Sequence, residues 1–267
     1  MESNYILHRR RWSHIKLEEI FRGPLSTIWK AHNFENTWAS KLWPSSGNLP
    51  EMFVVKEYSK RSGYKDPSVT MEREFACYRI LSPLQGVTIP RCYGPVQLQG
   101  HDKPALALQF LEGITLWDIA QSAESTAYDT DAICRGIDKC FFDISQFGVI
   151  QEDAEHDKLD NLMYAKTPVP RPPHFYVLAA STCALLPVSV SLKIGFCTIA
   201  WLAYSCLQRK PMCKWSVFMI DFGYTRTDKI EHCIETNLAS ARELKRTFQD
   251  WTRERKQRCS SKNMETK

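Results

Sequence analysis

The sequence predicts an α+β fold in which five strands and one helix form a first part and a few helices form a second part. Residues 16–112 make up the first part, and a hairpin-like stretch at 20–31, with a Gly-Pro turn, opens it. The apolar run 53–58 is the third predicted strand. Two further runs of β-forming residues, at 88–94 and 105–111, complete the set of five.

Helical spacing accounts for the remaining elements. A helix opens at Pro67 within the first part, because apolar residues recur at helical spacing after it. In the second part, residues 113–252, Thr115 is the expected N-cap of a helix and a second helix covers residues 130–147. Apolar residues three or four apart predict one more helix from Ile230 onward, with a packing face.

Charge and cysteine content restrict the partners and the compartment. The net charge of +5 is concentrated in a basic tail at residues 253–267, which is typical of a solvated chain end, so we expect no nucleic-acid partner. The ten cysteines form no C-x-x-C pair, and the first residues lack the apolar run of a signal peptide. These features predict an intracellular, cytoplasmic protein with free thiols and no structural zinc.

Two charged residues in the first part are candidates for holding a phosphate. Lys56 ends an apolar strand, where its ammonium can face polyphosphate oxygens while its aliphatic stem packs. Glu74 precedes Tyr78 by four residues on the predicted helix face, so its carboxylate can pair with Lys56 and orient it; Glu72 is the second choice. The alternative for both residues is an ordinary surface charge.

A third candidate follows the apolar run 217–220. Asp221 stands at the end of this predicted buried strand, in the tripeptide Asp221-Phe222-Gly223. A carboxylate at the end of a buried strand, with a glycine that frees the backbone, is a natural ligand for Mg²⁺. The alternative is a chance occurrence of the tripeptide.

In this order, the hairpin with Gly23, the Val-Val-Lys run, the helix Glu and the Asp-Phe-Gly tripeptide resemble the motifs of a protein kinase. The chain is similar in particular to the short, divergent kinase-like proteins abundant in filamentous fungi, over residues 16–161 and 216–225. The resemblance implies a protein-kinase-like two-lobed fold. Residues 16–112 would form a five-stranded N-lobe, residues 113–252 a truncated helical C-lobe with a hydrophobic insert, and ATP would lie between the lobes.

The resemblance also implies ATP and Mg²⁺ as cofactors and assigns roles to single residues. Gln109 and Leu111 would bound the hinge whose backbone holds the adenine, and Asn161 and Asp221 would hold the metal. Gly23 is the one glycine of the expected phosphate loop, so backbone cradling of phosphate is weak. The residues that would bind the nucleotide are Gly23, Lys56, Glu74, Gln109 and Leu111.

The catalytic loop departs from the family's pattern. Residues 151–153 fit the family's His-Arg-Asp, with Gln and Glu in place of His and Arg, which puts Asp153 at the catalytic base. Lys158 and Asn161 keep the family's spacing to each other, and Lys158 would be the catalytic lysine. Asp153 precedes Asn161 by eight residues where the family has five, so Asp157 is the alternative base.

An apolar insert separates the two expected metal ligands. It occupies about residues 166–215, and its central run, 175–207, is 33 residues long, short of the roughly 40 that two membrane spans require. A single span would put Asn161 and Asp221 on opposite sides of the membrane, so a span and an intact site exclude each other. Membrane association is therefore disfavoured but stays open. Its alternatives are an insert packed on the fold and a translated segment foreign to the mature protein.

Two functions stay open at this point. The first is a protein-kinase-like, ATP-binding phosphotransferase that acts on a protein or small-molecule substrate. The second is a pseudokinase, a binding or scaffold module. The grounds for this alternative are the three extra residues before Asn161 and the short chain after Gly223, in which we find no anchor for a peptide platform.

Overall fold

The structure is a computed structural model that describes residues 4–8, 11–34, 49–60, 66–122, 127–152, 158–168, 213–223 and 225–265. The chain divides into two units, residues 1–165 with 216–267, and residues 166–215. The barrel, the helices and the candidate site all belong to the first unit.

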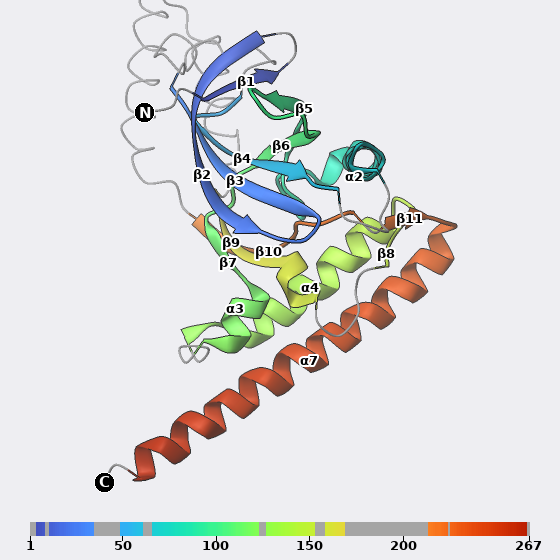
Figure 1. Ribbon diagram of the computed structural model, residues 1–267. Coiled ribbons are helices and arrows are strands. Elements are labelled where there is room, and N and C mark those ends of the chain that lie inside the picture. Colours follow the sequence, from blue (N-terminus) through green and yellow to red (C-terminus); the bar gives the residue numbers. More distant parts are fainter. Residues whose placement is uncertain are drawn as a thin grey trace, which may run out of the picture. The chain divides into compact units, whose positions relative to one another are not determined.

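Six strands of the first unit close into an antiparallel barrel (Figure 1). Neighbouring strands pair in the order β1-β2-β3-β4-β6-β5, and β5 pairs with β1 to close the ring. The expected hairpin is confirmed, because β2 and β3 are antiparallel around the turn at Gly23. The barrel strands are β1 (Asn4–His8), β2 (Arg11–Arg22), β3 (Ser26–Asn33), β4 (Met52–Tyr58), β5 (Cys92–Leu98) and β6 (Ala105–Gln109).

The predicted protein-kinase-like two-lobed fold with a five-stranded N-lobe is wrong: the structure has a closed six-stranded barrel and a few helices. The sequence interpretation missed β1, because its five residues precede a cluster of basic residues and resemble a charged chain end. Ile6 and His8 are nevertheless buried, as the alternation of a strand requires. Pairing of Ile6 with Leu98 on β5 converts an open sheet into a barrel without free edges.

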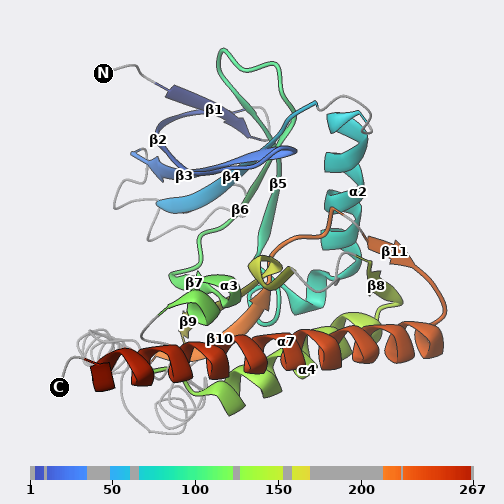
Figure 2. The same cartoon turned by 60° about the horizontal axis from the view of Figure 1, so that its bottom comes forward.

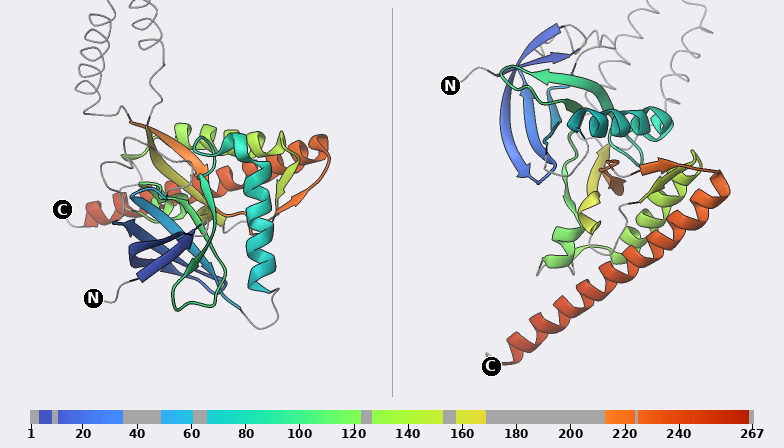
Figure 3. Two further views of the ribbon diagram at one scale, coloured as in Figure 1. Left: turned by 90° about the horizontal axis from the view of Figure 1, so that it is seen from above. Right: turned by 45° about the vertical axis from the view of Figure 1, so that its right-hand side comes forward.

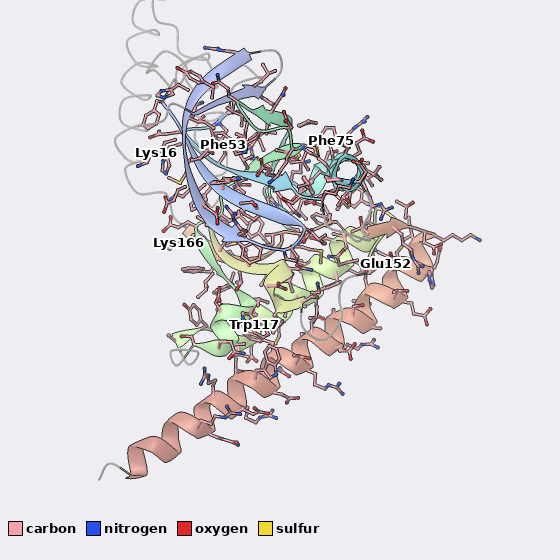
Figure 4. All side chains as sticks on the ribbon, in the orientation of Figure 1. Lys16, Phe53, Phe75, Trp117, Glu152 and Lys166 are labelled. Carbon is pink, nitrogen blue, oxygen red and sulfur yellow. The ribbon has the colours of Figure 1, made fainter. Side chains whose placement is uncertain are left out.

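Alternation along β4 gives the strand two different faces. Phe53, labelled in Figure 4, belongs to the apolar core of the barrel, and so does Val55. Val54 and Tyr58 instead pack on a second core, which the helices share. Because successive side chains of a strand point to opposite faces, Lys56 lies on the same outer face as Val54 and Tyr58.

The helices begin where the sequence predicts. Asp66 caps α2 by accepting a hydrogen bond from the backbone N–H of Ser68, and Thr115 caps α3 by accepting one from Asp118. The helices are α2 (Pro67–Ile80), α3 (Leu116–Gln121), α4 (Thr130–Ser145) and α7 (Ile230–Glu265), with short 3-10 turns at η1 (Ser82–Leu84) and η3 (Lys158–Asn161).

The described residues contain five more strands outside the barrel. One sheet has the order β10-β9-β7, and a separate antiparallel pair joins β11 to β8. The strand β10 leads directly to Asp221, and β8 to the predicted catalytic loop. These strands are β7 (Gly113–Thr115), β8 (Val149–Gln151), β9 (Leu162–Pro168), β10 (Cys213–Met219) and β11 (Thr225–Thr227).

The helix α7 packs along α4 in the antiparallel direction (Figure 2). Lys245 contacts Asp138, in the middle of α4, at 2.6 Å, whereas Ser145, at the C-terminal end of α4, donates a hydrogen bond to the carbonyl of Cys233. The C-terminal part of α7 extends beyond α3 (Figure 3). Within the described residues, no helix is both long enough and apolar enough to cross a membrane. The apolar run 175–207 lies outside the described residues.

A close approach between α4 and β10 fixes the strand that leads to Asp221. A Cβ atom at Gly136 would lie 2.5 Å from Val217 Cγ2 and 2.8 Å from Val217 Cβ. Neither atom belongs to a flexible side-chain end, so a larger residue at position 136 would push β10 away from α4.

We therefore expect Gly136→Ala to lower the free energy of unfolding by about 1–3 kcal/mol, as overpacking of a core does. Helix propensity alone would give the opposite sign, since alanine favours a helix over glycine by about 1 kcal/mol. Urea unfolding decides between the two, and a second change, Val217→Ala, should restore part of the loss. A more stable Gly136→Ala variant would contradict the close-approach argument.

Candidate functional site

A buried lysine bridges two carboxylates that come from distant parts of the sequence. Lys56 Nζ on β4 lies 2.7 Å from Glu74 Oε2 on α2 and 2.8 Å from Asp221 Oδ1, just after β10. The outer face of β4 turns Lys56 toward the helix, and the helix face turns Glu74 toward the strand. The three residues form one charged cluster where α2 meets the end of β10.

The cluster is buried on one side and open on the other. The side chain of Glu74 is 0% exposed and that of Lys56 is 8% exposed, whereas that of Asp221 is 36% exposed. Tyr58 donates a hydrogen bond to Glu74 Oε2 at 2.7 Å, while Glu74 Oε1 is buried without a hydrogen-bond partner among the described residues. Asp221 is therefore the member of the cluster that a ligand from solvent can reach.

The pKa values in the cluster follow from burial opposed by charge. Burial would lower the pKa of Lys56, but the charges of Asp221 and Glu74 outweigh it and hold that pKa above its usual value. Burial raises the pKa of Glu74 despite the neighbouring ammonium. Burial acts in the same direction on Asp221, but the charge and hydrogen bond of Lys56 outweigh it and keep the pKa of Asp221 below its usual value. Lys56 therefore stays protonated and Asp221 ionised at neutral pH.

The backbone around Asp221 is fixed on both sides. The N–H of Gly223 donates to Asp221 Oδ1 at 2.9 Å, and the N–H of Ile220 donates to the carbonyl of Asn161 at 2.9 Å. Phe222 is fully buried, and its ring meets the ring of Tyr78 edge-on, with centroids 5.2 Å apart. The tripeptide after β10 is thus anchored to the packed core by its central residue.

Two residues hold Asp221 from the other side: Gln151, which the sequence interpretation put in place of the family's His, and Asn237, to which it gave no role in the site. Gln151, at the end of β8, donates from Nε2 to the carbonyl of Asp221 at 2.8 Å. Asn237, on α7, accepts a hydrogen bond at Oδ1 from the backbone N–H of Gln151 at 3.1 Å. The signal in the sequence was Asn237 itself, a polar residue four positions before Ala241 on a helix face that buries apolar residues.

The structure places the other predicted nucleotide ligands in the barrel and its flank. Gly23 lies in the β2–β3 turn, where a Cβ atom would come within 2.8 Å of the Phe21 ring. The N–H of Gln109 donates to the carbonyl of Arg91 at 2.8 Å. Leu111 packs in a small apolar cluster with Phe218. Their roles in holding a nucleotide stay predictions.

The predicted catalytic loop is described only in part. Asp153 and Asp157, the two candidate bases, lie outside the described residues. Lys158 lies on η3, and its charge contributes to lowering the pKa of Asp221. Asn161 ends η3 with its backbone beside the segment that leads to Asp221, since its carbonyl accepts from Ile220.

The donor set around Asp221 fits Mg²⁺ better than a softer metal. Mg²⁺ takes oxygen ligands, commonly one or two carboxylates together with water and phosphate oxygens. Asp221 supplies a partly exposed carboxylate, and Asn161 lies on the adjacent segment. Among the described residues, no three His, Cys, Asp or Glu side chains gather into a ready-made metal site. A metal here would rely on phosphate oxygens as further ligands.

No model of a known protein family matches the chain, and no curated protein matches it either.

Proposed function

We propose that the protein binds ATP with Mg²⁺ at the Lys56–Glu74–Asp221 cluster and uses the site for phosphoryl transfer. One observation carries the proposal: a buried ammonium is held between a fully buried carboxylate and a partly exposed one. The buried carboxylate orients the lysine, and the exposed carboxylate is left for a metal.

Each residue of the cluster would have a different role in holding a triphosphate. Lys56 would move its hydrogen bond from Asp221 to phosphate oxygens, while Glu74, itself held by the Tyr58 hydroxyl, keeps the Lys56 ammonium in place. Mg²⁺, when bound, would neutralise charge on the phosphate oxygens. Asp221 would orient that metal, with Asn161 as its second ligand. Asp153 or Asp157 would accept the proton of the acceptor hydroxyl.

Binding of ATP in the presence of Mg²⁺, measured by titration calorimetry, tests the proposal. We expect Lys56→Met and Asp221→Asn each to weaken binding by about tenfold or more, because a charge-assisted hydrogen bond contributes about 1.5–3 kcal/mol. Lys139→Met is the matched control, since it removes a lysine from an exposed ion pair on α4. Unchanged binding in Asp221→Asn would overturn the assignment of the site.

A binding or scaffold module is the second candidate, and the chain after Asp221 favours it. Residues 225–227 pair with β8, and α7 begins at Ile230, so the chain passes from Asp221 into a packed helix with little intervening backbone. This course provides no extended segment on which a peptide could lie. Formation of ADP in the presence of candidate acceptors would support the transferase, and Mg²⁺-dependent ATP binding without turnover would support the module.

A further inference from the structure

A fully buried amide on α7 links that helix to the strand beside Asp221. Asn237 is 0% exposed and makes three hydrogen bonds within the described residues. Its Nδ2 donates to Ser145 Oγ at 2.9 Å and to the carbonyl of Val149 at 2.8 Å. Its Oδ1 accepts from the backbone N–H of Gln151 at 3.1 Å. Only an amide supplies two donors and an acceptor in this volume, so an Asp of the same shape would not replace it.

The next residue in the chain of contacts is Gln151. The backbone N–H of Gln151 donates to Asn237, which fixes the position of the Gln151 side chain. From that side chain, Nε2 donates to the carbonyl of Asp221 at 2.8 Å. Gln151 is 3% exposed, and its Oε1 is buried without a hydrogen-bond partner among the described residues. A half-satisfied buried amide costs stability relative to an apolar side chain. A glutamine at position 151 is explained if the hydrogen bond from its Nε2 serves to hold Asp221.

The contacts give Asp221 two supports of different kinds. Lys56 and the N–H of Gly223 hold its carboxylate, whereas Gln151 holds its backbone. A ligand that draws Lys56 away removes a support of the carboxylate but leaves the backbone support in place. In Figures 1 and 2, β8 and β11 lie between α2 and the N-terminal half of α7, where these contacts are made.

We propose that Asn237 is a positioning residue for Asp221 and acts through Gln151. The inference rests on the proposed function, since it concerns how α7 sets the affinity of that site for Mg²⁺ and ATP. Asn237 fixes β8, β8 fixes the Gln151 amide, and that amide fixes the backbone from which the Asp221 carboxylate extends. Partners that support a metal ligand in this way commonly change metal affinity by about tenfold or more when they are removed.

Three variants separate positioning from general stability. Asn237→Ala removes the amide that holds β8. Gln151→Met removes the amide that holds the Asp221 carbonyl and keeps the size of the side chain. Gln151→Met is expected to fold even if Asn237→Ala does not, because it replaces a half-satisfied amide by an apolar group. Thr252→Ala is the matched control: Thr252 is a buried polar residue of α7 whose hydroxyl donates to the carbonyls of Phe248 and Gln249 in its own helix.

The first readout is the affinity for ATP with and without Mg²⁺. We expect Asn237→Ala and Gln151→Met each to weaken binding about tenfold in the presence of Mg²⁺, and to leave metal-free binding unchanged. Thr252→Ala should change neither. Equal losses with and without Mg²⁺, or no loss in Gln151→Met, would overturn the positioning role.

The second readout does not depend on nucleotide. The N–H of Gly223 is hydrogen-bonded to Asp221 Oδ1, so its hydrogen exchange, followed by NMR, reports whether Asp221 is held. We expect faster exchange in Asn237→Ala and Gln151→Met and the wild-type rate in Thr252→Ala. If the wild-type chain binds no ATP, the proposed function is wrong, while faster exchange in the two variants would still support the positioning of Asp221. Unchanged exchange would overturn it.

Discussion

Replacing Lys56 by Met should lower the free energy of unfolding by about 3–5 kcal/mol at neutral pH, because removal of one partner leaves a buried charge uncompensated. The stranded charge is Glu74, whose side chain is fully buried. The Tyr58 hydroxyl still donates to Glu74 Oε2 in the variant, but a single neutral donor replaces little of what the ammonium provides.

The loss of stability in Lys56→Met should depend on pH, and the direction of this dependence follows from the pKa of Glu74. Burial already raises the pKa of Glu74 while Lys56 is present, and without Lys56 that pKa rises further. A folded-state pKa above the unfolded value, about 4.3, means that the folded state binds the proton more tightly. The stability of Lys56→Met is therefore retained below the unfolded pKa and is lost as pH rises through the raised pKa. Its deficit should be larger at about pH 8 than at about pH 5.

Urea unfolding at both pH values measures this prediction, and a second substitution tests its cause. Glu74→Gln in the Lys56→Met background removes the stranded charge, so the double variant should be more stable than Lys56→Met at about pH 8. Lys139→Met serves as the control, because it breaks an exposed ion pair and should cost at most about 1 kcal/mol. A double variant no more stable than Lys56→Met would show that Glu74 is not the source of the loss.

Local sequence signals predicted the elements well, because their causes are local. Pro67 and Thr115 mark helix starts through fixed backbone geometry and a capping hydroxyl, and the structure confirms both. The strand around Lys56 and the hairpin before it follow from alternation and turn chemistry. The structure also brings Lys56, Glu74 and Asp221 together, residues that the order of motifs had singled out.

The failures concern contacts between residues far apart in the sequence. The barrel closes because β1 pairs with β5, about 90 residues later, and nothing within residues 4–8 specifies that partner. The predicted packing face of α7 is confirmed at Ala241, Leu244 and Phe248, which are buried, but it is wrong at the first turn of the helix. Ile230 is 45% exposed, whereas Cys233 and Asn237 are buried. Apolar spacing extended the packing face back to Ile230, but in the N-terminal part of α7 the buried Asn237 instead bonds to α4 and to β8.

Phe222→Ala is the second substitution expected to have a large effect, with a loss of about 3–5 kcal/mol in the free energy of unfolding. Phe222 is fully buried in the core that the helices share. The loss combines the removed apolar area, the cavity left behind and the edge-on contact with Tyr78, a geometry that adds about 0.5–1.5 kcal/mol. Phe222→Leu keeps most of the volume and should cost about 1.5 kcal/mol or less.

Phe248→Ala is the matched control for this prediction. Phe248 is also fully buried in the same core, but it lies on α7, eleven residues beyond Asn237. We expect the two alanine variants to lose similar amounts of stability in urea unfolding, measured under conditions where both remain folded.

The two variants should nevertheless differ at the charged cluster. Phe222 anchors the backbone directly after Asp221, so its loss lets the Asp221 carboxylate move away from Lys56 Nζ, whereas loss of Phe248 leaves that distance unchanged. Phe222→Ala should therefore weaken Mg²⁺-dependent ATP binding and speed hydrogen exchange at Gly223, and Phe248→Ala should do neither. Equal effects of the two would mean that the cluster responds to overall stability alone. A difference would locate the control of Asp221 in the packing of Phe222 against α2, the helix that also carries Glu74.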